Sequence, residues 1–158
     1  MSLEIVPART AEDFEAVRHL FRVYQAWLDE PVCFDGFEGE LAGLPGRYAP
    51  PDGELLIGRV GSDVVGVVGI QPLNGIVGAC EIKRLYVCDS WRGNGFGRSL
   101  AEAALDWAAR AGYRSVGLET FEKLTAARDI YRRMGFVDRP SRDRNDLKSP
   151  IFMECTLV

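Results

Sequence analysis

The stretch Arg92-Gly93-Asn94-Gly95-Phe96-Gly97-Arg98-Ser99 lies between an apolar, strand-like run at residues 82–88 and a helical run at residues 100–111. Its three glycines let the backbone turn sharply and come close to a ligand without a side-chain clash. Where such a turn opens a helix, unpaired N–H groups and the positive end of the helix dipole converge on an anion, usually a phosphate. The stretch therefore predicts a phosphate-binding turn between a strand and a helix.

The segments on either side of this turn have alternating strand and helix patterns. Apolar residues recur at helical spacing in residues 14–28, around 37–44, and in 100–111 and 127–134, and Thr10 is placed to cap the first helix. Strand patterns occupy residues 4–8, 54–60, 64–72, 79–88, 115–120, 136–137 and 151–158. The strand at 79–88, the turn, the helix and the strand at 115–120 predict a crossover between two parallel strands.

Length and composition limit the class of protein. The 158 residues suit one domain, and 47% apolar with 27% charged residues are ordinary globular values. The net charge of −4 argues against a nucleic-acid partner, and no apolar run approaches the roughly 18 residues of a membrane span. The four cysteines lack metal-ligand spacing, and no signal peptide is recognisable. We expect a cytoplasmic protein, a single domain over 1–158, with no metal, nucleic acid or membrane partner.

Three kinds of phosphate ligand compete for the turn. A P-loop ends in Gly-Lys-Ser/Thr, and this turn has no lysine. A dinucleotide-binding turn would use Glu119 on the ribose, but it needs a third glycine where the bulky Arg98 stands. The third pattern, Arg-x-x-Gly-x-Gly, is satisfied by Arg92, Gly95 and Gly97. Dinucleotide binding by an oxidoreductase domain remains a weaker alternative.

At this point the chain resembles the GCN5-related N-acetyltransferase (GNAT) superfamily. The resemblance includes the Arg-x-x-Gly-x-Gly turn and the strand segment Lys83-Arg84-Leu85-Tyr86-Val87 before it. It also includes a later Ala-x-x-x-Tyr-x-x-x-Gly-Phe segment, which is present as Ala127, Tyr131, Gly135 and Phe136. Two positions depart from the family pattern, with Leu124 where many members have Asn and Asp89 where many have Pro.

The resemblance implies a mixed α/β fold of the GNAT type with three layers. Its central sheet is mixed and mostly antiparallel, splayed at a parallel strand pair and flanked by about four helices. The implied activity is direct transfer of acetyl from acetyl-CoA to a primary amine of a small molecule or peptide in a ternary complex. An acetyl-cysteine on Cys88 is disfavoured because no histidine is close in sequence. A non-catalytic acyl-CoA-binding or sensor domain is the alternative.

The resemblance also implies where acetyl-CoA binds. The backbone of the strand before the turn would bind the pantetheine amides, and the amides of the turn would bind the pyrophosphate. The implied cofactor-binding residues are Leu85, Tyr86, Val87, Arg92, Gly93, Asn94, Gly95, Phe96, Gly97, Arg98 and Ser99. Arg98, Lys123 and Arg128 are equal candidates for the 3′-phosphate.

Acetyl transfer needs a base and an acid. An unperturbed alkyl amine has a pKa of about 10.4, so a proton must leave before attack. Glu81 matches the position of a catalytic glutamate in histone-modifying members, although an ion pair with Lys83 or Arg84 is an equal alternative for it. Glu119 and a water chain are further candidates for the base. Tyr131 matches the family's acid, which protonates the leaving thiolate.

The acceptor is the least determined part. In this fold the groove would be bounded by the first helix with its following loop and by the loop before the last strand. The residues expected to face it are Trp27, Phe34, Phe37, Tyr48 and the stretch 143–148. The basic residues of 139–148 alternate with aspartates, which favours a solvated loop. The acceptor's identity and a homodimeric state stay open.

Overall fold

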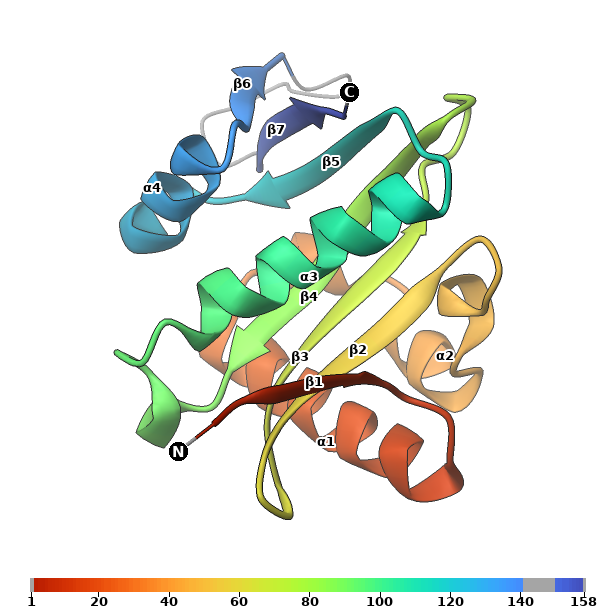
Figure 1. The fold of residues 1–158 in the computed structure, drawn as a ribbon, viewed down its shortest axis with the longest axis vertical. Helices are drawn as coiled ribbons and strands as arrows, with labels where there is room; N and C mark the ends of the chain where they lie inside the picture. The colour runs from red at the N-terminus through yellow and green to blue at the C-terminus, as the bar shows by residue number, and fades with distance from the viewer. Residues whose placement is uncertain (1, 141–149, 158) are drawn as a thin grey trace.

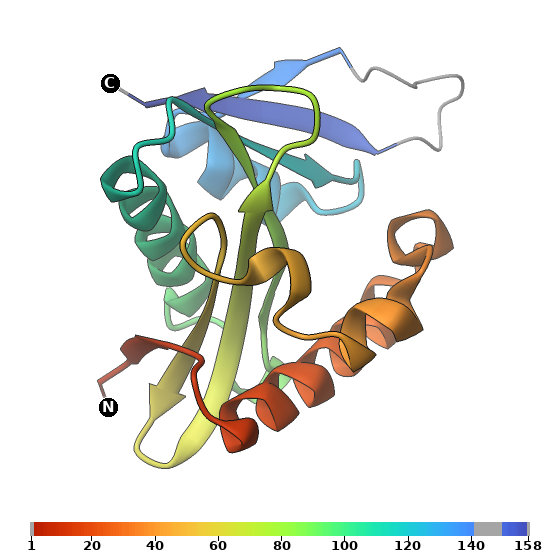
Figure 2. The same cartoon turned by 90° about the vertical axis from the view of Figure 1, so that its right-hand side faces the viewer.

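In the computed structural model, which describes residues 2–140 and 150–157, a seven-stranded sheet lies between two layers of helices (Figures 1 and 2). The strands are β1 (Glu4–Pro7), β2 (Glu54–Val60), β3 (Asp63–Pro72), β4 (Ala79–Val87), β5 (Ser115–Thr120), β6 (Val137–Arg139) and β7 (Ile151–Thr156). The α-helices are α1 (Ala11–Leu28), α2 (Phe37–Ala42), α3 (Phe96–Arg110) and α4 (Thr125–Arg133). Short 3₁₀ helices lie at Pro31–Phe34, Gly46–Tyr48 and Asp89–Trp91.

The strand order is β1-β2-β3-β4-β5-β7-β6. Every neighbouring pair is antiparallel except β4 and β5, which run parallel because α3 carries the chain from one to the other. The predicted mixed, mostly antiparallel sheet with one parallel pair is confirmed.

Side-chain alternation in the central strands supplies a core on each face of the sheet. Figures 1 and 2 show α1 and α2 on one face and α3 and α4 on the other. On β2, Leu55 and Ile57 pack toward α1, whereas Leu56 packs toward α3. Phe21 of α1 and Leu100 of α3 are fully buried in these two cores. The sheet is therefore covered on both faces and holds its strands firmly in register.

The predicted start is confirmed for α1 but not for α3. Thr10 and Asp13 form the predicted cap reciprocally, since the Thr10 hydroxyl accepts from the Asp13 amide and the Asp13 carboxylate accepts from the Thr10 amide, both at 3.1 Å. Helix α3 begins at Phe96 rather than at residue 100. The Ser99 amide donates to the Gly95 carbonyl at 3.1 Å, so the first turn of α3 includes the last glycine of the turn.

The parallel pair separates partway along its length. The β4–β5 ladder runs from Ala79–Ser115 to Ile82–Leu118, and β4 then continues to Val87 without a β5 partner. The register with β3 also shifts between Val67 and Gly69. The two strands therefore diverge at their C-terminal ends, which is visible in Figure 1, and the predicted splay is confirmed.

Two further expectations are changed by the structure. The strand expected at 136–137 extends further, and the solvated loop expected over 139–148 begins later, because Asp138 and Arg139 belong to β6 and pair with β7. Residues 141–149 lie outside the described part of the chain. Among the described residues, no helix combines the length and apolar character needed to cross a membrane.

Candidate functional site

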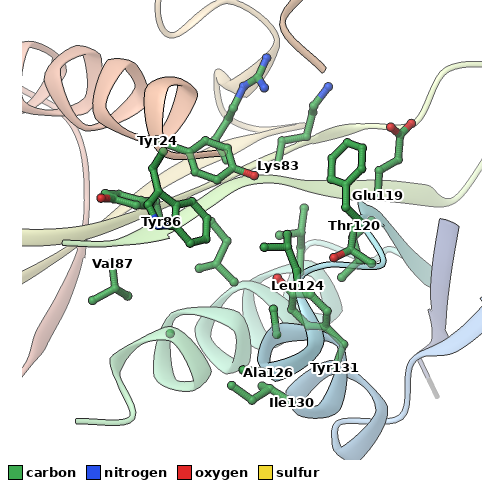
Figure 3. Close-up of a pocket in the computed structure, with 18 of the residues that line it drawn as sticks. Tyr24, Lys83, Tyr86, Val87, Glu119, Thr120, Leu124, Ala126, Ile130 and Tyr131 are labelled. Carbon is green, nitrogen blue, oxygen red and sulfur yellow. The ribbon is translucent and has the colours of Figure 1, made fainter. Parts of the chain in front are cut away.

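A cavity of about 920 Å³ lies where β4 and β5 diverge (Figure 3). Its walls come from both helical layers: α1 and the loop after it on one side, and the glycine turn, the first turn of α3 and α4 on the other. The diverging ends of β4 and β5 form its floor. The splay thus lets a ligand pass between the strands and reach both faces of the sheet.

The three glycines of the turn, Gly93, Gly95 and Gly97, line this cavity and expose backbone to it. Gly93 and Gly95 have φ angles of 84° and 77°, a region that disfavours residues with a Cβ. A Cβ built on either glycine would meet no atom within 4 Å, so the space beside the turn is open. Helix α3 has no side-chain cap at its N-terminus. Its first amides are therefore available to an anion such as a pyrophosphate.

The Arg92 side chain is already engaged within the protein. Its Nε donates to the Val87 carbonyl at 3.2 Å, and its Nη1 is 3.1 Å from an Asp89 carboxylate oxygen. The guanidinium also lies 4.5 Å from the centre of the Trp27 ring and 5.2 Å from that of Tyr86. These contacts fix the turn against β4 and α1.

The remaining candidates near the turn divide into two groups. Asn94 and Ser99 do not line the cavity, because their side chains donate to the carbonyls of Trp91 and Gly95. Of the three candidates for the 3′-phosphate, Arg98 and Lys123 line the cavity and Arg128 does not.

The edge of β4 beyond Ile82 provides a second backbone surface. In a regular ladder its N–H and C=O groups would pair with β5, but here that edge faces the cavity through Lys83, Leu85, Tyr86 and Val87. Backbone groups of this kind suit amides such as those of a pantetheine arm. The glycine turn and this edge lie along one continuous wall, as expected for a ligand with a phosphate at one end and amides at the other.

Arg84 creates the irregularity in β4. It has a φ of 61°, which is strained for a residue with a Cβ. Its guanidinium donates to both Glu40 carboxylate oxygens, at 2.8 and 3.1 Å, and to the Cys33 carbonyl at 2.9 Å. It also lies 4.4 Å from the centre of the Phe34 ring. The buried Arg84 thus compensates its backbone strain by joining β4 to α2 and the preceding loop.

Tyr131 reaches the cavity from α4 (Figure 3). The residue is 8% exposed, and its ring makes an edge-on contact with Phe136. Burial, with a smaller contribution from Tyr24, raises the pKa of Tyr131 well above its usual value. Burial likewise raises the pKa of Tyr24, across the cavity, to about 12. Both phenols are protonated at neutral pH and can donate a hydrogen bond.

Thr120 contributes a buried hydroxyl at the end of β5. The residue is 2% exposed, and its Oγ1 has no hydrogen-bond partner among the described residues. It lines the cavity, and Figure 3 shows it beside Leu124 and Tyr131. A buried hydroxyl without a partner is unfavourable, so this atom fits a ligand that brings a hydrogen-bond acceptor into the splay.

Two glutamates line the cavity from neighbouring strands. Glu81 is buried on β4 and accepts a hydrogen bond from Gln71 Nε2 at 3.1 Å. The alternative of an ion pair with Arg84 is wrong, because Arg84 pairs with Glu40, and no ion pair joins Glu81 to Lys83 within the described residues. Glu119 lies on β5, one residue beyond the end of the parallel ladder.

The expectation for the acceptor groove is wrong for three aromatic residues. Phe34, Phe37 and Tyr48 are buried in the core beneath α1 and do not line the cavity. They belong to one apolar cluster, in which the Arg84 guanidinium lies against the rings of Phe34 and Phe37 and the Tyr48 hydroxyl donates to Glu40 at 2.9 Å. Trp27 does line the cavity, and residues 143–148 lie outside the described chain.

Sequence reasoning missed several lining residues. Tyr24, Val32, Cys33, Asp35, Lys83 and Thr120 line the cavity. The alternation of β5 places Leu118 and Thr120 on one face, which is a signal for Thr120. The 3₁₀ helix at Pro31–Phe34 has no comparable periodicity. Among the described residues, no three His, Cys, Asp or Glu side chains are grouped to hold a metal ion.

Comparisons with known proteins agree with this geometry. A sequence model described as the acetyltransferase (GNAT) family matches residues 14–136. An uncharacterised N-acetyltransferase of Schizosaccharomyces pombe is 28% identical over 153 residues, which cover 96% of this chain and 93% of that protein.

Solved structures share the fold along nearly the whole chain. An acetyltransferase of the GNAT family from Staphylococcus aureus has a TM-score of 0.79 at 16% identity, covering 99% of this chain and 100% of that one. The PaiA N-acetyltransferase of Thermoplasma acidophilum, determined in complex with coenzyme A, has a TM-score of 0.77 at 19% identity, with the same coverage.

Proposed function

The chain belongs to the acetyltransferase (GNAT) family, and from this premise we propose that residues 1–158 act as one unit that transfers acetyl from acetyl-CoA to a primary amine of a small molecule or peptide. One observation carries the proposal: a single cavity joins the N-terminus of α3, the unpaired edge of β4 and the Tyr131 hydroxyl. When bound, acetyl-CoA supplies a thioester that an amine can attack.

The cofactor is held mainly by backbone. The amides at Gly93 to Arg98 and the helix dipole of α3 bind the pyrophosphate, and the β4 edge at Leu85 to Val87 binds the amides of the arm. Arg92 acts by positioning, because its side chain ties the turn to Val87 and Trp27. Thr120 Oγ1 donates a hydrogen bond to the ligand in the splay, which gives that buried hydroxyl its missing partner.

Glu81 is the base in this proposal. Its carboxylate lies on the wall of the cavity, at the point where the strands begin to separate, and Gln71 fixes its orientation. It removes a proton from the acceptor ammonium, directly or through water. Glu119, on the neighbouring strand, and a water chain are the alternatives to be tested.

Tyr131 is the acid. Its buried phenol is protonated at neutral pH because its pKa is raised by burial, and that is the state required to donate a proton to a leaving thiolate. Direct transfer is favoured over an acetyl-cysteine, because burial also raises the pKa of Cys88 and leaves its thiol a weak nucleophile at neutral pH.

The proposed location is the cytoplasm, where the four free cysteines would stay reduced. A homodimer is compatible with this site, since every residue assigned a role comes from one chain.

The test is mass spectrometry of amines after incubation with acetyl-CoA and the protein. We expect a gain of one acetyl group on at least one amine from a panel of amino acids, polyamines, aminoglycosides and peptides. Glu81→Gln should lower the rate about 10²-fold or more without changing acetyl-CoA affinity. If Glu119→Gln has that effect and Glu81→Gln does not, the base is Glu119.

A further inference from the structure

The cations that line the cavity differ in whether they form ion pairs within the protein. They are Lys83, Arg84, Arg92, Arg98 and Lys123. Four of them form ion pairs within the protein: Arg84 with Glu40 at 2.8 Å, Arg92 with Asp89 at 3.1 Å, Arg98 with Glu102 at 2.6 Å and Lys123 with Glu30 at 2.9 Å. Within the described residues, Lys83 is the cavity-lining cation that has no ion pair or side-chain hydrogen bond.

Lys83 occupies a particular place in the splay. It is the first β4 residue beyond the parallel ladder, which ends at Ile82 and Leu118. Figure 3 shows the Lys83 and Glu119 side chains projecting away from α3 and α4. The chain thus carries an ammonium group on one strand and a carboxylate on the next, at the entrance to the gap between them.

The Cys33 thiol reports the electrostatics of this entrance. Its pKa is raised to about 11, chiefly by burial and further by the charges of Glu119 and Glu30, while the charges of Lys83 and Arg84 act to lower it. Cys33 is therefore within electrostatic reach of both Lys83 and Glu119. The Arg84 charge is paired with Glu40, whose pKa the Lys83 charge also lowers. Within the described residues, Lys83 is the cation on this side that forms no ion pair, so it can pair with a bound anion.

Spacing along β4 relates Lys83 to the proposed base. Glu81 and Lys83 are two residues apart on one face of a regular strand segment, which separates their Cα atoms by about 6.5 Å. A small molecule can span that interval if it carries an amine and an acidic group a few bonds apart. A polyamine presents no acidic group, and a peptide N-terminus presents one at that distance only where its first residue is acidic.

We propose that the acceptor is a compact amine that also bears a carboxylate, such as an α-amino acid, and that Lys83 binds the carboxylate while the amine lies toward Glu81. This inference rests on the proposed acetyltransferase function and adds a substrate class to it. The Lys83 ammonium forms a charge-assisted hydrogen bond with the acid group, stronger than a bond between neutral partners. Lys83 is thus a specificity residue rather than a catalytic one.

The experiment compares matched acceptors. Each set contains an amino acid, its α-carboxamide and the amine that lacks the acid group, with several side chains represented. Thiol release from acetyl-CoA gives kcat and KM for wild type, Lys83→Met, Lys83→Arg and Arg110→Gln. Arg110 is the control because it is an exposed cation of α3 that does not line the cavity.

We expect wild type to prefer the amino acid over its carboxamide at least tenfold in kcat/KM. Lys83→Met should remove that preference through a higher KM for the amino acid, with the carboxamide unchanged. Lys83→Arg should retain most of the preference, and Arg110→Gln all of it. A thermal unfolding midpoint close to wild type is expected for Lys83→Met, since Lys83 has no described partner to lose.

Failure of this inference is distinguishable from failure of the proposed function. Equal use of carboxamides and amino acids, unaffected by Lys83→Met, would overturn the inference and leave the acetyltransferase in place. Absence of thiol release with every amine, from wild type that binds acetyl-CoA, would overturn the function and the inference together.

Discussion

Thr120 and Tyr131 bring two buried hydroxyls to one cavity from different elements. The Tyr131 ring packs against Phe136, so its position depends on the core, whereas the Thr120 hydroxyl has no partner in the described chain. Core residues are normally selected for stability, and a buried hydroxyl without a partner opposes it. A residue of this kind is best explained by what it does when a ligand is bound.

Thr120→Val separates these two effects, because valine has the same shape without the hydroxyl. The ligand-free variant should be more stable by about 0.5 to 1 kcal/mol, while its affinity for acetyl-CoA should fall about three- to tenfold. Chemical denaturation and isothermal titration calorimetry measure the two quantities, and Thr120→Ser is the control that keeps the hydroxyl. An unchanged affinity would remove Thr120 from the binding site.

Elements rather than single residues shape the splay. Strand β4 departs from β5 after Ile82, and its irregularity at Arg84 is held by the ion pair with Glu40 on α2. Burial alone would raise the pKa of Glu40, but the hydrogen bonds and charge of Arg84, with smaller contributions from Tyr48 and Lys83, outweigh it and lower the pKa. Helix α2 thus stabilises the geometry of a strand that carries the site.

Glu40→Gln tests this link through pH. A carboxylate whose pKa is lowered by folding stabilises the protein above its unfolded pKa of about 4.3, and this contribution is lost as pH falls through the folded pKa. Wild type should therefore lose stability more steeply than the variant between about pH 5 and 3. At pH 7 the variant should be less stable by about 1 to 3 kcal/mol, as urea denaturation would measure. Parallel pH profiles would contradict the assignment.

The glycine turn is the second element that shapes the site, and α3 offers a matched control for it. Gly95 and Gly112 lie at opposite ends of α3, have φ angles of 77° and 94°, and each has open space where a Cβ would be. Replacing either with alanine should lower stability by a similar amount, about 1 kcal/mol. Only Gly95→Ala should weaken CoA binding, at least tenfold by calorimetry. Equal affinities in the two variants would show that the turn does not hold the phosphates.

The sequence predicts most helices and strands, but few of the contacts between them. The glycine turn, the Thr10 cap and the parallel pair follow from local patterns, and the structure contains all three. The start of α3 at Phe96 was missed because glycines conceal a helical first turn. The sequence does not show that Lys83 lacks an ion pair, because that depends on which carboxylates pair with Arg84, Arg92, Arg98 and Lys123 in the folded chain.

The burial of the aromatic residues in 34–48 is a second feature that the sequence does not predict. Their composition is equally suited to a groove and to a core, and only the packing around Arg84 decides between them. A single sequence does not show which of its aromatic residues are covered by segments distant along the chain.

At the scale of the whole molecule, the sheet separates two tasks. The glycine turn and α3 lie on one face of the sheet and the loop after α1 on the other (Figure 2). The Lys83 side chain points away from α3 (Figure 3), and the gap between β4 and β5 connects the two faces. A cofactor entering from the first face can thus meet an acceptor entering from the second.

This arrangement predicts which ligands stabilise the fold. A ligand that binds the native state raises the unfolding temperature by mass action, so acetyl-CoA and CoA at about 100 times their dissociation constants should add about 2.7 kcal/mol. Differential scanning fluorimetry with NADH and NADPH provides the comparison. Stabilisation by the dinucleotides but not by CoA would contradict the assignment of the turn.

The central claim is that one cavity both binds acetyl-CoA and transfers its acetyl group to an amine. The most direct measurement is amine-dependent release of CoA thiol by wild type and by Tyr131→Phe, with acetyl-CoA affinity measured in parallel. We predict release by wild type and a loss of about 10² in kcat for Tyr131→Phe at nearly unchanged affinity. Binding of acetyl-CoA without thiol release for any amine would contradict the claim and identify a sensor domain instead.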